Sequence, residues 1–241
     1  MLEAMLPPFY LIGHRGAAGH EPENTLRSVE AALRLGVDAV EVDVHVVEGR
    51  LVVIHDERLE RTTNGRGRLD EHGFEALRRL DAGRGERIPT LDEVVELVGD
   101  RAELVVELKG AGTAGPVAAL LRARGPATAD RVVVSSFDHV ELARLRALLP
   151  TVRRGALVAG VPLDYARFAR ELGAHSVHMS AEFLRVPFVD DAHARGMAVW
   201  AYTVNHADDA RRMRALGVDG VFSDVPDVIR QREEQELGTR N

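Results

Sequence analysis

Cysteine is absent from this 241-residue sequence, which excludes disulfide bonds and metal sites built on thiolates. Long apolar runs are absent too, since no stretch reaches the length needed to cross a bilayer. Residues 1–8 have neither the basic start nor the long apolar segment of a signal peptide. We therefore expect a cytoplasmic protein with no stable insertion into a membrane.

Lysine is almost absent, because Lys109 is the only lysine among 31 lysine and arginine residues. A GC-rich genome is the simplest reason for the arginine excess, and such a bias carries no site chemistry. Lys109 stands out against it, since an ammonium and a guanidinium are not interchangeable at a tight site. The formal net charge of −7 argues against a general nucleic-acid binder, which needs a positive surface. It leaves room for one phosphate group held by a local site.

Strand-like and helix-like segments alternate along the chain, and several strand candidates are nearly continuous apolar runs, typical of buried parallel strands. We predict strands at residues 9–12, 39–44, 51–54, 104–108, 132–135, 154–158, 176–179, 197–203 and 218–222. We predict amphipathic helices at residues 25–35, 91–98, 115–123, 139–148, 163–172, 186–195 and 207–216. About eight strand–helix repeats predict an α/β fold of the (β/α)8 TIM barrel type.

One strand candidate is in excess of the barrel, and the segment "EVDVHVVEGRLVVIHD" accounts for it. The few residues between Val46 and Leu51 cannot form the crossover that parallel strands require. We expect residues 51–54 to return antiparallel, as a hairpin that turns at Glu48-Gly49 and brings His55 roughly level with Asp43.

The remaining segments do not indicate a second domain. We interpret residues 56–89, which include a short helical stretch at 71–80, as an insertion over one end of the barrel. Residues 228–241 are expected to form a charged helix that ends in disorder. Residues 1–241 are therefore predicted to form one barrel domain.

Carboxylates occur with a spacing of two residues on the predicted strands. Glu41 and Asp43 share one face of their strand, as do Glu107 and Lys109 of another. Charged residues at the carboxyl ends of barrel strands line the mouth, where active sites lie. Three carboxylates there would repel one another, and Mg²⁺ or Ca²⁺ with oxygen ligands would remove that repulsion. An ion-pair network with Lys109 and Arg15 is the alternative.

Two histidines are expected at the same mouth. His14 and Arg15 follow the first strand in "LIGHRG", and the hairpin brings His55 to the same level. Two imidazoles, a guanidinium and a cation suit phosphoryl transfer, with one histidine taking a proton and the other donating one. A structural hydrogen bond is the alternative for each histidine alone. His45 shares the face of Glu41 and Asp43 and is the best further candidate.

Other polar and aromatic residues have structural interpretations. Asn24 or Thr25 is expected to cap the first helix, and Asp224 the final one. Three aromatic residues are candidates for a substrate-contacting wall, with core packing as the alternative: Phe137, Trp200 and Tyr202.

Taken together, the motifs resemble those of the glycerophosphodiester phosphodiesterases. The resemblance runs from about Leu11 to Pro226 and rests on "GHRG" with "PENT", "EVDVHVVEGRLVVIHD", "TTNGRG", "IPTLDEVVEL", "VVELKG", "SSFD", "YTVN" and "GVDGVFSD". Many members have Trp before "TVN", where this sequence has Tyr202. The insertion at residues 56–89 is short, as in compact bacterial members.

The resemblance implies a metal-dependent barrel enzyme, a phosphoric diester hydrolase of lipid and glycerol metabolism. It would cleave small-molecule substrates such as glycerophosphocholine or glycerophosphoethanolamine to glycerol 3-phosphate and an alcohol. The matching positions are the metal ligands Glu41, Asp43 and Glu107, the acid–base pair His14 and His55, and the phosphate contacts Arg15 and Lys109.

Three other functions remain open at this point. A related barrel could cleave lysophospholipids in the manner of a phospholipase D, which would favour an apolar groove or a membrane-binding surface. Another metal-dependent barrel, an isomerase or a nuclease, could use the same ligand types. A non-catalytic phosphodiester-binding protein could keep the fold, but it would be expected to have lost at least one of the named charges.

Overall fold

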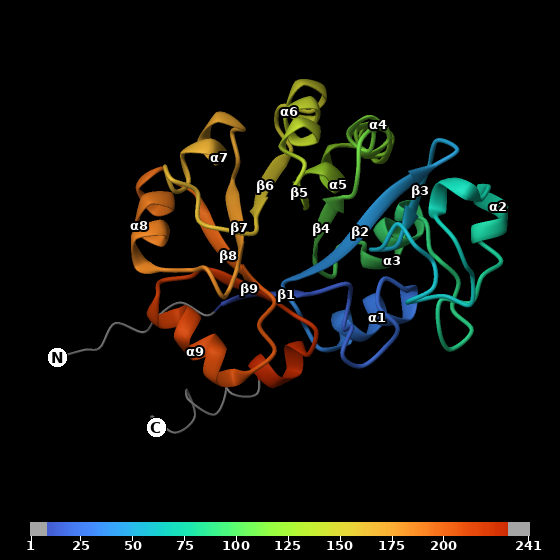
Figure 1. Cartoon of the computed structure of the whole chain (residues 1–241), viewed down its shortest axis with the longest axis horizontal. Helices are drawn as coiled ribbons and strands as arrows, with labels where there is room; N and C mark the ends of the chain where they lie inside the picture. The colour runs from blue at the N-terminus through green and yellow to red at the C-terminus, as the bar shows by residue number, and fades with distance from the viewer. Residues whose placement is uncertain (1–8, 231–241) are drawn as a thin grey trace.

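The computed structural model describes residues 9–230, and its centre is a closed barrel of parallel strands (Figure 1). The strands are β1 (Tyr10–Gly13), β2 (Ala39–Val47), β3 (Arg50–Val53), β4 (Glu103–Leu108), β5 (Val132–Ser136), β6 (Arg153–Val158), β7 (Ser176–Ser180), β8 (Ala198–Tyr202) and β9 (Gly220–Ser223). Their order is β1-β9-β8-β7-β6-β5-β4-β2-β3, and pairing of β1 with β2 closes the ring. Only β3 runs antiparallel. The predicted (β/α)8 TIM barrel is therefore confirmed.

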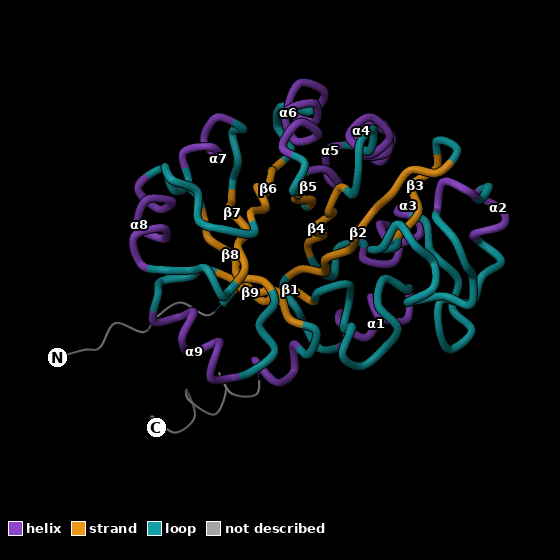
Figure 2. Tube along the Cα trace, in the orientation of Figure 1, coloured by secondary structure: helices purple, strands orange, loops and turns teal. Residues whose placement is uncertain are grey.

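The helices surround the strands on the outside of the barrel (Figure 2). They are α1 (Leu26–Arg34), α2 (Phe74–Leu77), α3 (Leu91–Val98), α4 (Ala114–Arg124), α5 (Pro126–Ala129), α6 (His139–Leu148), α7 (Arg167–Glu171), α8 (Val186–Ala194) and α9 (Ala207–Ala215), with a 3₁₀ turn at Leu69–Glu71. The sequence reasoning missed α5, which is too short for a periodic pattern. The helix expected from residue 163 begins only at Arg167, because Tyr165 has a φ of 47°. The tail helix expected at 228–241 lies almost entirely outside the described residues.

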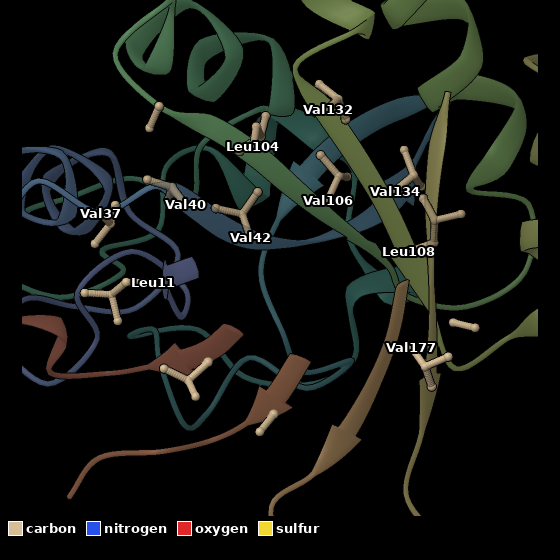
Figure 3. Packing of buried hydrophobic residues seen from close by; sticks show 14 of the residues in the cluster. Leu11, Val37, Val40, Val42, Leu104, Val106, Leu108, Val132, Val134 and Val177 are labelled. Atoms are coloured by element: carbon tan, nitrogen blue, oxygen red, sulfur yellow. The ribbon is translucent and has the colours of Figure 1, made fainter. Parts of the chain in front are cut away.

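Valines in alternating positions explain how the strands pack. On β2, Val40 and Val42 point outward to the helices, and Figure 3 shows them beside Leu104 and Val106 of the neighbouring strand β4. The residues between them point into the barrel. A second buried cluster fills the barrel interior below the mouth, and its buried members are Ile12, Ala39, Val105, Val133, Trp200 and Phe222.

The hairpin of β2 and β3 has the geometry that the sequence predicts. Glu48 and Gly49 have φ angles of 50° and 74°, the pair of positive values of a type I′ turn. The Ile54 amide donates to the Asp43 carbonyl at 3.1 Å, so His55 emerges level with the inward-facing carboxylates. His45 Nε2 lies 3.1 Å from the His55 carbonyl and joins the hairpin to the segment that follows.

Residues 56–89 pack on this hairpin through a separate apolar cluster. Leu59, Leu69 and Phe74 bury their side chains against Val52 and Ile54. The Thr90 side chain and Glu93 form a reciprocal cap at the start of α3, and Glu93 also pairs with Arg78 at 2.6 Å. The insertion is thereby fixed to the hairpin at one end and to α3 at the other. Within residues 9–230, no helix is both long enough and apolar enough to span a membrane.

Arg154 of β6 connects several chain segments through hydrogen bonds to backbone carbonyls, although its side chain is only 7% exposed. Its guanidinium donates to the carbonyls of Val152, Gly173, Pro150, Leu172 and Leu149, at distances from 2.6 to 3.4 Å. Several of these carbonyls lie at the ends of α6 and α7, where no intrahelical donor remains.

We expect Arg154→Met to lower the free energy of unfolding by about 1–3 kcal/mol, because five backbone carbonyls around this buried guanidinium, one of them from a buried residue, lose a donor together. Urea unfolding followed by circular dichroism measures the change. Arg167→Met is the matched control, since that side chain is exposed and its ion pairs are long. A loss at Arg154 no larger than at Arg167 would contradict this assignment.

Candidate active site

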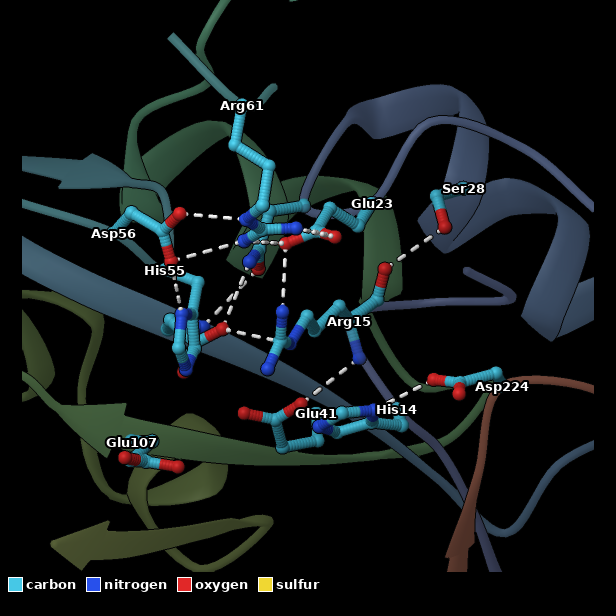
Figure 4. Close-up of polar contacts among 12 residues, drawn as sticks. His14, Arg15, Glu23, Ser28, Glu41, His55, Asp56, Arg61, Glu107 and Asp224 are labelled. Atoms are coloured by element: carbon cyan, nitrogen blue, oxygen red, sulfur yellow. Dashed lines mark hydrogen bonds and ion pairs between the residues drawn. The ribbon is translucent and has the colours of Figure 1, made fainter. Parts of the chain in front are cut away.

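A cavity of about 260 Å³ opens at the carboxyl ends of the barrel strands. One side of it carries the charged groups that the sequence singled out, and Figure 4 shows most of them converging there. They are His14, Arg15, Glu41, His55, Glu107 and Lys109. Asp43 lies directly beside them, since it pairs in register with Glu107 on the neighbouring strand.

Three carboxylates meet below the charged side of this cavity. Glu41, Asp43 and Glu107 each place an oxygen within 4.8 Å of the others. Glu41 and Asp43 point into the barrel because they alternate with Val40, Val42 and Val44 on β2. Both are at most 2% exposed. The predicted convergence of these three residues is therefore what the fold produces.

The electrostatics of the triad fit a divalent cation. Burial, followed by repulsion from Asp43 and Glu107, raises the pKa of Glu41 well above its ordinary value. Burial and repulsion from Asp43 likewise raise the pKa of Glu107. Glu41 Oε1 has no hydrogen-bond partner within residues 9–230, although it is buried. A set of buried carboxylate oxygens with a free acceptor matches what Mg²⁺ or Ca²⁺ binds.

Two cations of the protein balance part of this charge. Lys109 Nζ lies 2.5 Å from Glu107 and 3.3 Å from Asp43. Arg15 Nε lies 3.4 Å from Asp43. Burial alone would raise the pKa of Asp43, but Lys109 and Arg15 outweigh it and hold that pKa below its ordinary value. Three carboxylates facing two cations leave one negative charge, so the ion-pair network and a cation site are compatible.

Arg15 reaches this position through its backbone conformation. Its φ is 52°, a left-handed value that is uncommon for a residue with a side chain. In this conformation its amide donates to Glu41 Oε2 at 2.8 Å. The Arg15 carbonyl accepts from the Ser28 hydroxyl of α1 at 2.8 Å. Arg15 thus joins β1, β2 and α1 at one point.

Each of the two histidines is oriented by a carboxylate at the same ring nitrogen. His14 Nδ1 lies 2.7 Å from Asp224 Oδ1, and His55 Nδ1 lies 2.6 Å from Asp56 Oδ1. Both Nε2 atoms lack a hydrogen-bond partner in the described part of the chain, so they remain for a ligand. A carboxylate at Nδ1 fixes the tautomer and the ring orientation, as in acid–base catalysis.

Asp224 was expected to cap the final helix. Its main contacts are instead with His14 and Asn205. Besides His14, Asp224 accepts from Asn205 Nδ2 at 2.6 Å, and its own amide donates to Asn205 Oδ1 at 2.8 Å. Burial would raise the pKa of Asp224, but the contacts with His14 and Asn205 hold it low. Asp224 follows β9, which pairs with β1, so these contacts depend on closure of the barrel.

A second pair of contacts links the insertion to the site. Arg61 donates to both oxygens of Glu23 at 2.7 and 2.9 Å, and to both oxygens of Asp56 at 2.6 and 3.0 Å. Glu23 also accepts from Arg15 at 2.7 Å. Arg61 therefore shares one carboxylate with Arg15 and another with His55 (Figure 4). The hydrogen bonds from Arg61, followed by those with His55, hold the pKa of Asp56 far below its usual range.

The prediction that Asn24 or Thr25 caps α1 is confirmed for Thr25. Thr25 is the cap of α1, since its hydroxyl accepts from the Ser28 amide at 3.1 Å. Asn24 instead donates to Asp43 Oδ2 at 2.8 Å and accepts from the Asp43 amide at 3.1 Å. Asn24 has a φ of 58°, which this residue type tolerates and which directs its side chain to β2. The cap signal was correct for the helix but assigned no role to its neighbour.

The aromatic candidates lie at two depths. Phe137 and Tyr202 line the cavity, with their rings perpendicular at 5.9 Å between centroids. Trp200 is buried one level deeper, where its ring stacks on Tyr10 at 5.1 Å. It is not among the residues that line the cavity. Core packing, the alternative weighed for these residues, describes Trp200.

Comparison with known sequences identifies the family of this chain. Residues 14–228 match the model of the Glycerophosphoryl diester phosphodiesterase family. The chain is 35% identical over 231 residues to a glycerophosphodiester phosphodiesterase of Caldanaerobacter subterraneus subsp. tengcongensis, covering 91% of this chain and 95% of that protein. It is also 35% identical to a glycerophosphodiester phosphodiesterase of Bacillus altitudinis, covering 93% of this chain and 98% of that protein.

Solved structures give the same result for the fold. A phosphodiesterase of Oleispira antarctica, in complex with the product sn-glycerol-3-phosphate, is 33% identical and superposes with a TM-score of 0.89, covering 96% of this chain and 98% of that one. A glycerophosphodiester phosphodiesterase of Agrobacterium tumefaciens is 30% identical with a TM-score of 0.79, covering 92% and 99%. With this family match and relatives this similar over nearly their whole lengths, the chain belongs to the glycerophosphoryl diester phosphodiesterase family of enzymes.

Proposed function

We propose that this enzyme hydrolyses glycerophosphodiesters, such as glycerophosphocholine and glycerophosphoethanolamine, to glycerol 3-phosphate and an alcohol. The observation that carries this proposal is the pair of carboxylate-oriented histidines beside a buried acidic triad. The Oleispira antarctica phosphodiesterase, which holds sn-glycerol-3-phosphate, supports the identity of the phosphorylated product.

Glu41, Asp43 and Glu107 would hold a divalent cation, Mg²⁺ or Ca²⁺. When bound, the cation neutralises charge on a phosphate oxygen. The chain's own cations complete the phosphate site. Arg15 and Lys109 lie on either side of Asp43 and can offer N–H groups to further phosphate oxygens.

The histidines supply the proton transfers. Nε2 of one histidine takes the proton from the attacking hydroxyl, which belongs either to water or to the glycerol 2-position. The new P–O bond forms as the bond from phosphorus to the alcohol oxygen breaks. Nε2 of the other histidine donates a proton to that departing oxygen. If the glycerol 2-hydroxyl attacks, the product of this step is a cyclic phosphate, and water must then attack phosphorus and break the bond to the glycerol 2-oxygen to give glycerol 3-phosphate. Asp56 and Asp224 hold the two rings in place at Nδ1 throughout.

Removing divalent cations with EDTA is expected to stop glycerol 3-phosphate release from glycerophosphocholine, and added Mg²⁺ or Ca²⁺ should restore it. Bound cation should also raise the melting temperature, because it relieves repulsion within the triad. Glu41→Gln should lose both the restored activity and the rise in melting temperature.

Glu141→Gln is the matched control for this experiment, since Glu141 is also buried but bonds Ala114 and Arg144 outside the triad. This variant should retain both metal responses. Full activity of the Glu41→Gln variant in excess metal would refute the ligand role of Glu41.

His14→Ala and His55→Ala are each expected to lower kcat by about 10²–10⁴-fold with little change in KM, because each removes a proton-transfer group. A coupled assay of glycerol 3-phosphate release measures both constants. His193→Ala is the control, since His193 pairs with Asp219 on the outside of the barrel at 2.8 Å. A loss below tenfold at both catalytic candidates would rule out the acid–base assignment.

Arg61→Ala is expected to lower kcat/KM by about 10–100-fold, the usual effect of losing a residue that orients catalytic groups. Without Arg61, Glu23 would bind Arg15 more tightly and Asp56 would contact His55 alone. Arg61→Lys should recover only part of the activity, because an ammonium cannot bond both carboxylates in the same bidentate manner.

Arg58→Ala provides the comparison for Arg61, because Arg58 lies in the same insertion and pairs with the exposed Glu60. It should leave kcat/KM within about twofold of the wild type, as expected for a surface ion pair. If Arg58→Ala and Arg61→Ala lowered kcat/KM equally, the effect would come from the insertion in general, and the specific role of Arg61 would be contradicted.

A further inference from the structure

A second cavity, of about 180 Å³, lies beside the catalytic one, and we call it the side groove. The insertion forms one of its walls, with Glu57, Arg68 and Asp70. The loop that follows β4 forms another wall, at Ala111. Lys109 lines both cavities, so the side groove adjoins the place where the phosphate is expected to bind.

The insertion wall of the side groove carries more negative than positive charge. Arg68 pairs with Glu57 at 2.9 Å and with Asp70 at 3.1 Å, so two carboxylates share one guanidinium and one negative charge is left over. Both carboxylates are accessible to a ligand, since their side chains are 60% and 71% exposed. Lys109 does not neutralise this wall, because it forms its ion pairs with the acidic triad.

His45 of β2 adds an uncharged hydrogen-bond acceptor to the side groove, which it also lines. Its Nε2 lies 3.1 Å from the His55 carbonyl, which is an acceptor, so Nε2 carries the ring proton. A histidine with an ordinary pKa is neutral at pH 8, and Nδ1 is then an acceptor. Nδ1 has no hydrogen-bond partner within residues 9–230, and its surface is not fully covered by protein.

The far side of the catalytic cavity has the opposite character. Phe137, Leu157, Tyr202 and Phe222 line it, and none of these side chains is charged. The Tyr202 hydroxyl already donates to the Val158 carbonyl at 2.9 Å. An ammonium group placed there would lose water without gaining an anionic partner. The two substituents of a bound phosphodiester therefore meet two different environments, and the cationic one is suited to the side groove.

We propose that the side groove binds the leaving alcohol and selects an alcohol that carries a primary ammonium, as ethanolamine does. This inference rests on the proposed function. A primary ammonium brings three N–H donors to the acceptors of Glu57, Asp70 and His45. The quaternary ammonium of choline has no N–H group and keeps only the weaker attraction between charges. The neutral glycerol unit then occupies the apolar side of the catalytic cavity.

The test compares three substrates that release the same product. They are glycerophosphoethanolamine, glycerophosphocholine and the methyl ester of glycerol 3-phosphate, each followed at pH 8 by the coupled assay with Mg²⁺ or Ca²⁺ present. In the wild type, kcat/KM for glycerophosphoethanolamine should exceed that for glycerophosphocholine by about tenfold, mainly through KM. The methyl ester has no group to place in the side groove, so its hydrolysis reports on folding and chemistry alone.

The double variant Glu57→Gln/Asp70→Asn removes the negative charge and keeps the size of both side chains. It should lower kcat/KM for glycerophosphoethanolamine by about 3–10-fold, mainly through KM, and leave the methyl ester within about twofold. Its preference for ethanolamine over choline should shrink accordingly. Glu60→Gln is the matched control, because Glu60 pairs with Arg58 in the same insertion at 2.9 Å but lines neither cavity. It should leave all three substrates unchanged.

Ala111→Leu tests the position of the subsite independently of its charge. The larger side chain takes space from the side groove on the wall opposite the carboxylates. It should lower kcat/KM for glycerophosphoethanolamine and glycerophosphocholine alike, by about 5–10-fold, and leave the methyl ester within about twofold.

The outcomes separate this inference from the function on which it rests. Equal losses on all three substrates, no loss on glycerophosphoethanolamine, or a wild type without a preference for it would each overturn the role of the side groove while the hydrolase activity stands. A wild-type enzyme that releases no glycerol 3-phosphate from any of the three substrates would overturn the proposed function, and this inference with it.

Discussion

Mutual repulsion among Glu41, Asp43 and Glu107 is the constraint on which the rest of the site depends. Carboxylates taken out of water at such short range cannot all remain ionised unless positive charge is brought to them. Arg15 and Lys109 supply part of this positive charge through ion pairs with the triad. The three carboxylates could also hold a metal ion. The same positive charges are what a phosphodiester requires. The positive charges that offset repulsion within the buried triad are therefore also suited to binding a phosphate group.

The barrel places these groups by strand register rather than by loop conformation. Asp43 and Glu107 are opposite each other because β2 and β4 pair in parallel, and Glu41 follows from the two-residue repeat of the same strand. Glu41 and Asp43 are therefore as rigid as the sheet itself. The histidines lie just beyond strand ends, and each needs a separate carboxylate to fix its ring. The strands thus fix the positions of the carboxylates, and side-chain hydrogen bonds fix the orientation of the two histidine rings.

The sequence was sufficient for the barrel, because periodic apolar runs and the short hairpin turn are local signals. It was also sufficient to predict that the triad and His55 lie close together. Alternation along the strands and the geometry of the hairpin determine the positions of these residues. Asp224 was misassigned because its capping signal is local, whereas its contact with His14 spans 210 residues. The contact of Asn24 with Asp43, across 19 residues, was missed for the same reason, although the cap expected at Asn24 or Thr25 is correct. The depth of Trp200 could not be predicted either, because the stagger of barrel strands is a property of the closed ring.

The contact between His14 and Asp224 determines when the His14 ring becomes oriented during synthesis and folding of the chain. The two residues lie near opposite ends of the described chain, on strands that meet only when the ring closes. During synthesis, His14 leaves the ribosome 210 residues before the carboxylate that orients it. A nascent chain therefore lacks an oriented His14 until β9 has been made and has paired with β1. The orientation of this ring is thus acquired together with closure of the barrel, and not before it.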